Sequence, residues 1–99
     1  MNDENIVLMA RLKVKADKIE EAKAAALAIV EPSRNEPGCI KYDVHQIIDD
    51  PTVFLWHETW ANQQAIDEHF EMSYFKEFAA TVEKIAEVPP QIILSKKIS

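Results

Sequence analysis

The stretch VFLWHETW, residues 53–60, decides the predicted fold. Its eight residues are mostly aromatic and aliphatic, a length and composition typical of a β-strand. Side chains alternate between the two faces of a strand. One face would carry Phe54, Trp56, Glu58 and Trp60, and the other Val53, Leu55, His57 and Thr59. Both faces begin with large apolar residues, which predicts a strand that needs cover on both sides.

The residues before this stretch predict its hairpin partner. CIKYDVHQII, residues 39–48, has strand character, and IDDPT, residues 48–52, has turn chemistry because Pro51 presets φ and aspartates favour turns. Gly38, the single glycine of the chain, precedes this strand and is free to take a positive φ.

The remaining helices and strands are predicted before and after this hairpin. IVLMARLKV, residues 6–14, predicts a first strand, and Asp17 with Glu20 predicts a capped helix that kinks or ends around Glu31 because of Pro32. Asn62 and Ser73 are expected to cap two short helices, and QIILSKKIS, residues 91–99, predicts the last strand. The order is βαββαβ with a split second helix, an α+β ferredoxin-like pattern.

Length, charge and cysteine content limit the class of protein. The 99 residues predict a single domain over residues 1–99, and a net charge of −6 without a basic cluster argues against nucleic acid or an anionic membrane as partner. Cys39 is the only cysteine, and the acidic start MNDEN is the reverse of a signal peptide. We therefore expect a cytoplasmic protein.

An association surface follows from the predicted layers. In this topology both crossover helices lie on one face of the sheet, so one chain leaves the other face uncovered. Because that face also carries apolar residues, we expect a homodimer whose sheets face each other; the alternative is a monomer with a mixed outer face.

His57 and Glu58 look like part of the zinc-protease pattern H-E-x-x-H, but Trp60 stands in the final place. Neighbours on a strand point to opposite faces, so the pair cannot form that site. His45, His57 and His69 lie on three different predicted elements without a paired ligand motif, and we expect no metal.

His69 has two readings. It shares a helical stripe with Ala65, Ile66 and Phe70, and it would look toward Glu58 and Trp60 if that strand face lies beneath the helices. A histidine and carboxylate walled by aromatic rings would suit deprotonation of a phenol-like ligand. The alternative is a core histidine satisfied by a carbonyl group or by Glu58.

Three further residues are candidates for the site. Tyr42 could donate a hydrogen bond to a ligand or pack as a core tyrosine, and Tyr74 could line a pocket mouth. His45 shares its face with Asp43 and Lys41, which is typical of a solvated or interface residue. Cys39 has no basic sequence neighbour to activate its thiol, which argues against a nucleophilic role.

Three stretches together resemble the antibiotic biosynthesis monooxygenase family, in its small quinol-monooxygenase-like branch. These are PSRNEPGCIKYDVHQ, then FLWHETW, then QAIDEHFEMSYFKEF, and the similarity runs from about residue 32 to residue 78. The resemblance implies a dimeric α+β barrel and O₂ chemistry without a cofactor on an electron-rich phenol or hydroquinone. It implies that His69 and Glu58 form the catalytic centre, with the substrate bound by Trp60, Tyr42, Tyr74, Phe75 and His45.

One departure concerns Tyr74, which stands where many relatives carry a histidine before the phenylalanine. Other members of the superfamily isomerise phosphorylated diones, and others are non-enzymatic ligand-binding or stress-response modules. Arg11 and Arg34 are the only arginines, and neither has a basic neighbour that would complete a phosphate site.

Overall fold

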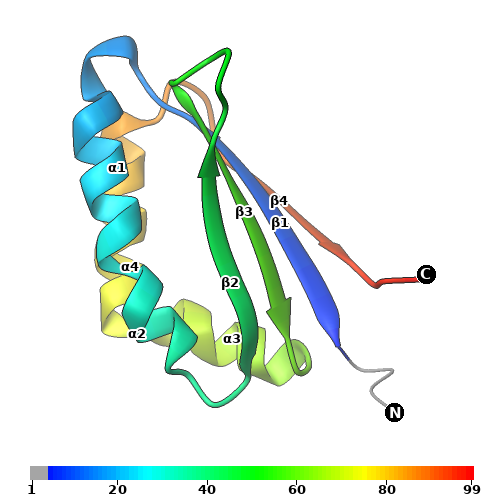
Figure 1. Ribbon diagram of the computed structural model, residues 1–99. Helices are drawn as coiled ribbons and strands as arrows, with labels where there is room; N and C mark the ends of the chain where they lie inside the picture. Colours follow the sequence, from blue (N-terminus) through cyan, green and yellow to red (C-terminus); the bar gives the residue numbers. More distant parts are fainter. Residues whose placement is uncertain (1–4) are drawn as a thin grey trace.

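The computed structural model describes residues 5–99 and confirms the ferredoxin-like α+β topology (Figure 1). Four strands form one antiparallel sheet in the order β2-β3-β1-β4. The strands are β1 (Ile6–Lys13), β2 (Cys39–Gln46), β3 (Val53–Trp60) and β4 (Gln91–Ser95). The predicted hairpin is confirmed as the β2–β3 pair, although β2 and β4 end two and four residues earlier than expected.

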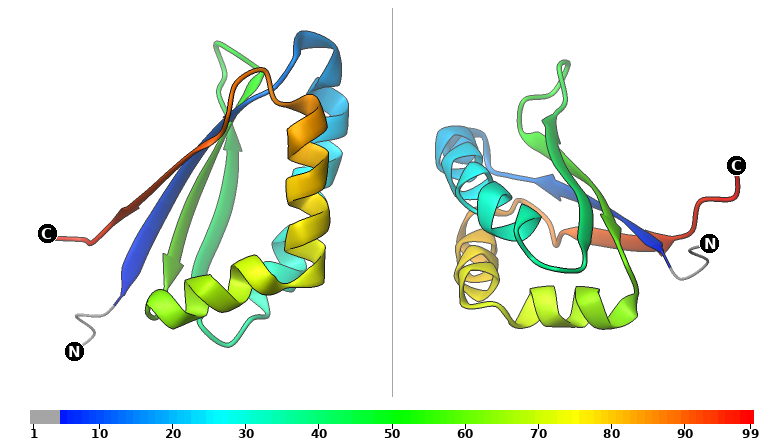
Figure 2. Two further views of the ribbon diagram at one scale, coloured as in Figure 1. Left: turned by 180° about the vertical axis from the view of Figure 1, so that it is seen from behind. Right: turned by 60° about the horizontal axis from the view of Figure 1, so that its bottom comes forward.

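All helices lie on one face of the sheet (Figures 1 and 2). They are a 3-10 turn (Ala16–Lys18), α1 (Ile19–Ala28), α2 (Val30–Arg34), α3 (Gln63–Glu71) and α4 (Ser73–Ile85). The second crossover is split into α3 and α4, as predicted. None of the helices in residues 5–99 is both long and apolar enough to cross a membrane.

The core lies between this helical layer and the sheet. Register places Glu58 opposite Leu8 on β1 and opposite Tyr42 on β2, so the three side chains share the helix-facing side. That face is buried along β3, with the indole of Trp60 fully covered. Two alanines of α1, Ala22 and Ala26, are buried against it, as the small side chains of this helix predict.

Two of the three helix-start predictions are wrong. Asp17 lies inside the 3-10 turn, and α1 starts at Ile19 without a side-chain cap. Ser73 is the first residue of α4, so the cap position falls on Met72. Asn62 is confirmed as a cap, because its Oδ1 accepts the Ala65 N–H at 2.9 Å.

The break before Pro32 falls earlier than expected. The first helix ends at Ala28, and Pro32 sits within the first turn of the new helix α2, where a missing N–H costs no intrahelical bond.

Gly38 does not use its freedom to adopt a positive φ, and no other residue in the described range has one. The glycine is needed for close approach instead. A Cβ at this position would lie 2.3 Å from the Cβ of Ala65, so α3 packs directly on the backbone that leads into β2.

The opposite face of the sheet has no cover within residues 5–99 (Figure 2). Met9 and Ile93, which are directly opposite each other on β1 and β4, are 46% and 59% exposed. His45 is also exposed on this outer face, since it pairs with Leu55 of β3.

Candidate functional site

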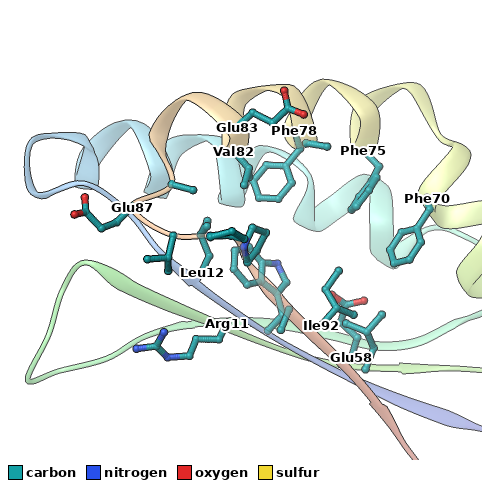
Figure 3. Close-up of a pocket in the computed structure, with 18 of the residues that line it drawn as sticks. Arg11, Leu12, Glu58, Phe70, Phe75, Phe78, Val82, Glu83, Glu87 and Ile92 are labelled. Carbon is teal, nitrogen blue, oxygen red and sulfur yellow. The ribbon is translucent and has the colours of Figure 1, made fainter.

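A cavity of about 670 Å³ lies between the helix-facing side of the sheet and α4 (Figure 3). Its walls are mostly apolar and include Leu8, Leu12, Trp56, Phe75, Phe78 and Val82. Polar groups are few. Glu58 and Tyr42 reach it from the sheet, whereas Glu83 and Glu87 are exposed at its other end. An apolar cavity with a few polar groups is the usual form of a small-molecule site.

Glu58 is the buried acid of this cavity. Its side chain comes from β3, it is 4% exposed, and its Oε1 accepts the indole N–H of Trp60 at 2.7 Å. Burial raises the pKa of Glu58 to about 7, an effect that the Trp60 hydrogen bond opposes and the negative charge of Glu36 reinforces. A carboxyl group that titrates near neutral pH suits proton transfer.

His69 pairs with a carboxylate that the sequence did not reveal. Its Nδ1 lies 2.7 Å from Oε2 of Glu36, which follows α2, and both side chains are buried. The prediction that His69 faces Glu58 is therefore wrong. The loop after α2 brings Glu36 to the imidazole. The carboxylate of Glu58 instead accepts a hydrogen bond from the Trp60 indole.

Tyr74 extends this pair toward the start of α4. Its hydroxyl contacts Oε2 of Glu36 in a short hydrogen bond and lies 3.2 Å from the carbonyl oxygen of Pro32. Tyr74 of α4, Glu36 of the turn after α2 and His69 of α3 thus form a continuous hydrogen-bonded chain.

The imidazole of His69 is enclosed by aromatic rings. Its centroid lies 4.6 Å from that of Trp60, 5.0 Å from Phe75 and 5.9 Å from Tyr42. The rings of His69 and Trp60 pack directly on each other, so a ligand has no space between them. The cavity lies beside them and shares Tyr42, Phe70 and Phe75 with the surroundings of the imidazole.

The predicted site residues fall into three groups. Tyr42, Phe75 and Glu58 line the cavity. His69, Trp60 and Tyr74 do not line it and belong to the packed cluster beside it. His45 is on the outer face and contributes to a separate groove there.

Cys39 and the cavity-lining Tyr42 are poor nucleophiles and bases at neutral pH. Burial raises the pKa of the Cys39 thiol to about 11, with the charges of Glu58 and Glu36 adding to the effect. Burial also raises the pKa of Tyr42 above its usual range. Both groups are therefore protonated at neutral pH, and Tyr42 is available as a hydrogen-bond donor.

Within residues 5–99, no three His, Cys, Asp or Glu side chains are grouped to hold a metal ion. Glu58 is the cavity-lining group whose pKa is brought near neutrality, so proton transfer is the chemistry that this arrangement best supports.

Comparison with known proteins gives the same classification. Residues 5–81 match the family model described as "Antibiotic biosynthesis monooxygenase". The chain is 32% identical over 88 residues to "Putative monooxygenase YcnE" of Bacillus subtilis, covering 89% of this chain and 93% of that protein. It is 39% identical over 94 residues to a Synechocystis protein, sll1783, covering 95% of this chain but only 64% of the length of that protein.

Solved structures agree with the fold. The PA3566 protein of Pseudomonas aeruginosa superposes with a TM-score of 0.93 at 25% identity, covering 100% of this chain and 99% of the other. A protein of Nitrosomonas europaea described as a "Putative antibiotic biosynthesis monooxygenase" gives 0.92 at 26% identity, covering 99% and 94%. By its sequence match over most of its length and by its fold, the chain belongs to the antibiotic biosynthesis monooxygenase family.

Proposed function

We propose that the protein is a cofactor-independent monooxygenase that oxidises a small, electron-rich aromatic compound of the hydroquinone or phenol type with O₂. The observation that carries this proposal is Glu58, a buried carboxyl group on the wall of an apolar cavity whose pKa is raised to about 7. The family membership of the chain supports the same reaction class.

In the proposed reaction Glu58 accepts the proton of a substrate hydroxyl group. The aromatic anion that results is electron-rich and passes electrons to O₂ itself, so the protein supplies a base and a dry cavity. For a hydroquinone the balance is one quinol plus one O₂ giving one hydroxyquinone plus one H₂O. One oxygen atom enters the ring, and the other leaves as water with the two hydrogens that the substrate loses.

The charge of the lining favours a neutral substrate over a phosphorylated one. Three carboxylates, Glu58, Glu83 and Glu87, border the cavity, and Arg11 is the only cation among its lining residues. Arg11 pairs with Leu55 on β3, so it belongs to the outer side of the sheet, and Figure 3 shows it pointing away from the helices. This arrangement disfavours the alternative of an isomerase of phosphorylated diones.

We also propose that the working form is a cytoplasmic homodimer of single-domain subunits whose outer sheet faces meet. The support is the uncovered apolar surface around Met9, Ile93 and Leu55, which water would otherwise contact. Ile92 and Leu94 of β4 are also about half exposed, but they pair with Ala10 and Leu8 and therefore belong to the helix-facing side, not to this surface.

Oxygen uptake tests the proposed reaction. The protein is prepared in metal-free buffer and mixed with a panel of hydroquinones while O₂ is recorded with an electrode. The proposal expects uptake above the rate of autoxidation in buffer. Conversion of a phosphorylated dione without O₂ consumption would favour the isomerase, and a ligand bound but unchanged would favour a binding module.

A further inference from the structure

We propose that Glu36 is a positioning residue that acts on the cavity acid Glu58 through His69 and Trp60. In this account Glu36 fixes the imidazole as its Nδ1–H tautomer, the imidazole supports the Trp60 indole, and the indole holds the carboxylate. The inference rests on the proposed function only for its effect on turnover, because the tautomer is a property of the resting protein.

The contacts form an unbroken series from the turn after α2, through α3, to β3. Glu36 Oε2 lies 2.7 Å from His69 Nδ1, the rings of His69 and Trp60 are 4.6 Å apart between centroids with 37° between their planes, and Trp60 Nε1 lies 2.7 Å from Glu58 Oε1. Glu36, His69 and Glu58 are at most 8% exposed, and Trp60 is fully buried. Each member is thus held by packing as well as by its polar contact.

Glu36 determines which nitrogen of His69 carries the proton. A carboxylate accepts hydrogen bonds and donates none, so Nδ1 must be the protonated nitrogen wherever Glu36 is ionised. Tyr74 reinforces this arrangement, because its hydroxyl contacts the same Oε2 of Glu36. A carboxylate behind an imidazole is a general way of fixing its tautomer and ring orientation.

The second nitrogen of His69, Nε2, is consistent with the Nδ1–H tautomer. Nε2 is buried and has no hydrogen-bond partner among residues 5–99. Buried polar atoms without partners are uncommon in folded proteins. In the Nδ1–H tautomer Nε2 is an unprotonated lone pair, which is cheaper to bury unpaired than an N–H⁺ would be.

The ionisable groups around the imidazole are few. Glu36 faces it from the segment after α2, Tyr74 from α4 and Tyr42 from β2, whereas Glu58 of β3 lies beyond the Trp60 indole. A change at Glu36 therefore has two separable effects on Glu58, the loss of a nearby charge and the loss of imidazole orientation.

A matched pair of variants separates these effects. Glu36→Gln and Glu36→Ala remove the same charge, but only Gln retains an oxygen that accepts the Nδ1–H. ¹⁵N NMR of the histidine rings at pH 8, assigned to His69 with a His69→Gln variant, reads the tautomer directly. We expect Nδ1–H in the wild type and in Glu36→Gln, and loss of that preference in Glu36→Ala.

The turnover rates of the two variants should differ in the same way as their His69 tautomers. Glu36→Ala should lower kcat on the order of 10- to 100-fold, the range that loss of a residue that orients a histidine typically costs. KM should change little, because Glu36 does not line the cavity. Glu36→Gln should recover most of the loss, and Glu31→Ala, an exposed acid on α2, should behave as wild type.

Two results would overturn the proposal. One is an Nε2–H tautomer for His69 in the wild-type protein, which requires neither a variant nor a substrate. The other is equal kcat values for Glu36→Gln and Glu36→Ala. Absence of oxygen uptake by the wild type would instead remove the proposed function and leave the tautomer result standing.

Discussion

Trp60 and Glu58, two residues apart on β3, are joined by a buried hydrogen bond of 2.7 Å from the indole N–H to a carboxylate oxygen. The indole lies wholly within the core, while the carboxyl group reaches the cavity wall. This bond fixes the direction of the one cavity acid whose pKa lies near neutrality, and most of the proposed chemistry depends on it.

Turnover should depend on the charge of Glu58. A base must be unprotonated, so kcat/KM should rise with pH through about 7, the value to which burial raises the pKa of this group. Glu58→Gln should lower kcat/KM by about 10²- to 10⁴-fold, the usual contribution of a general base. A pH–rate profile measures both effects. Glu83→Gln, at the exposed end of the cavity, is the control, and equal losses in the two variants would remove Glu58 as the base.

The same carboxyl group should make folding stability depend on pH. Because its pKa is about 7 in the folded protein and near 4.5 when unfolded, the folded state binds the extra proton between these values. The stabilisation is complete below pH 4.5 and is lost as pH rises through 7, to an extent of about 3 kcal/mol. Urea unfolding of Glu58→Gln should therefore show a flatter pH dependence than wild type, with Glu68→Gln on the surface of α3 as control.

Gly38 should be required for its lack of a side chain. Gly38→Ala should destabilise the fold by about 1–3 kcal/mol, the usual cost of overpacking, because the new Cβ meets that of Ala65. Chemical denaturation of Gly38→Ala, Ala65→Gly and the double variant measures this coupling. The double variant should recover part of the lost free energy of unfolding. If the effects of the two single changes on this free energy simply add, the Cβ of residue 38 does not clash with that of Ala65 and the explanation is wrong.

The strands and the buried face of β3 could be predicted because alternation and turn chemistry are local properties of the chain. Val53–Trp60 has the same bounds in the structure as in the sequence pattern, and Trp60 and His69 are buried as their stripes indicated. Asn62 was recognisable as a cap because its partner is only three residues away.

Glu36 could not be found in this way. It lies in a turn between Arg34 and Gly38, where a polar residue is ordinary, and its partner His69 is 33 positions away. No spacing rule connects a turn to a helix at that distance. The single signal in the sequence is the place of His69 on an apolar helical stripe, which calls for a hydrogen-bond partner in the core and leaves the identity of that partner open.

The uncovered face of the sheet should hold two subunits together. Met9→Lys places a charge in the middle of the proposed interface, so the protein should run as a monomer in analytical ultracentrifugation while wild type runs as a dimer. Leu27→Lys is the matched control, since Leu27 is an exposed apolar residue of α1, away from that face. A wild-type protein that is monomeric at high concentration would contradict the proposed assembly.

The central claim is that a substrate bound beside Glu58 reacts with O₂ without help from a metal or cofactor. The most direct measurement is mass spectrometry of the product after turnover of a hydroquinone under ¹⁸O₂ in metal-free, flavin-free buffer. The account predicts one ¹⁸O atom in each hydroxyquinone formed by the wild type, and almost none above background for Glu58→Gln. Equal labelling by wild type, Glu58→Gln and buffer alone would contradict it.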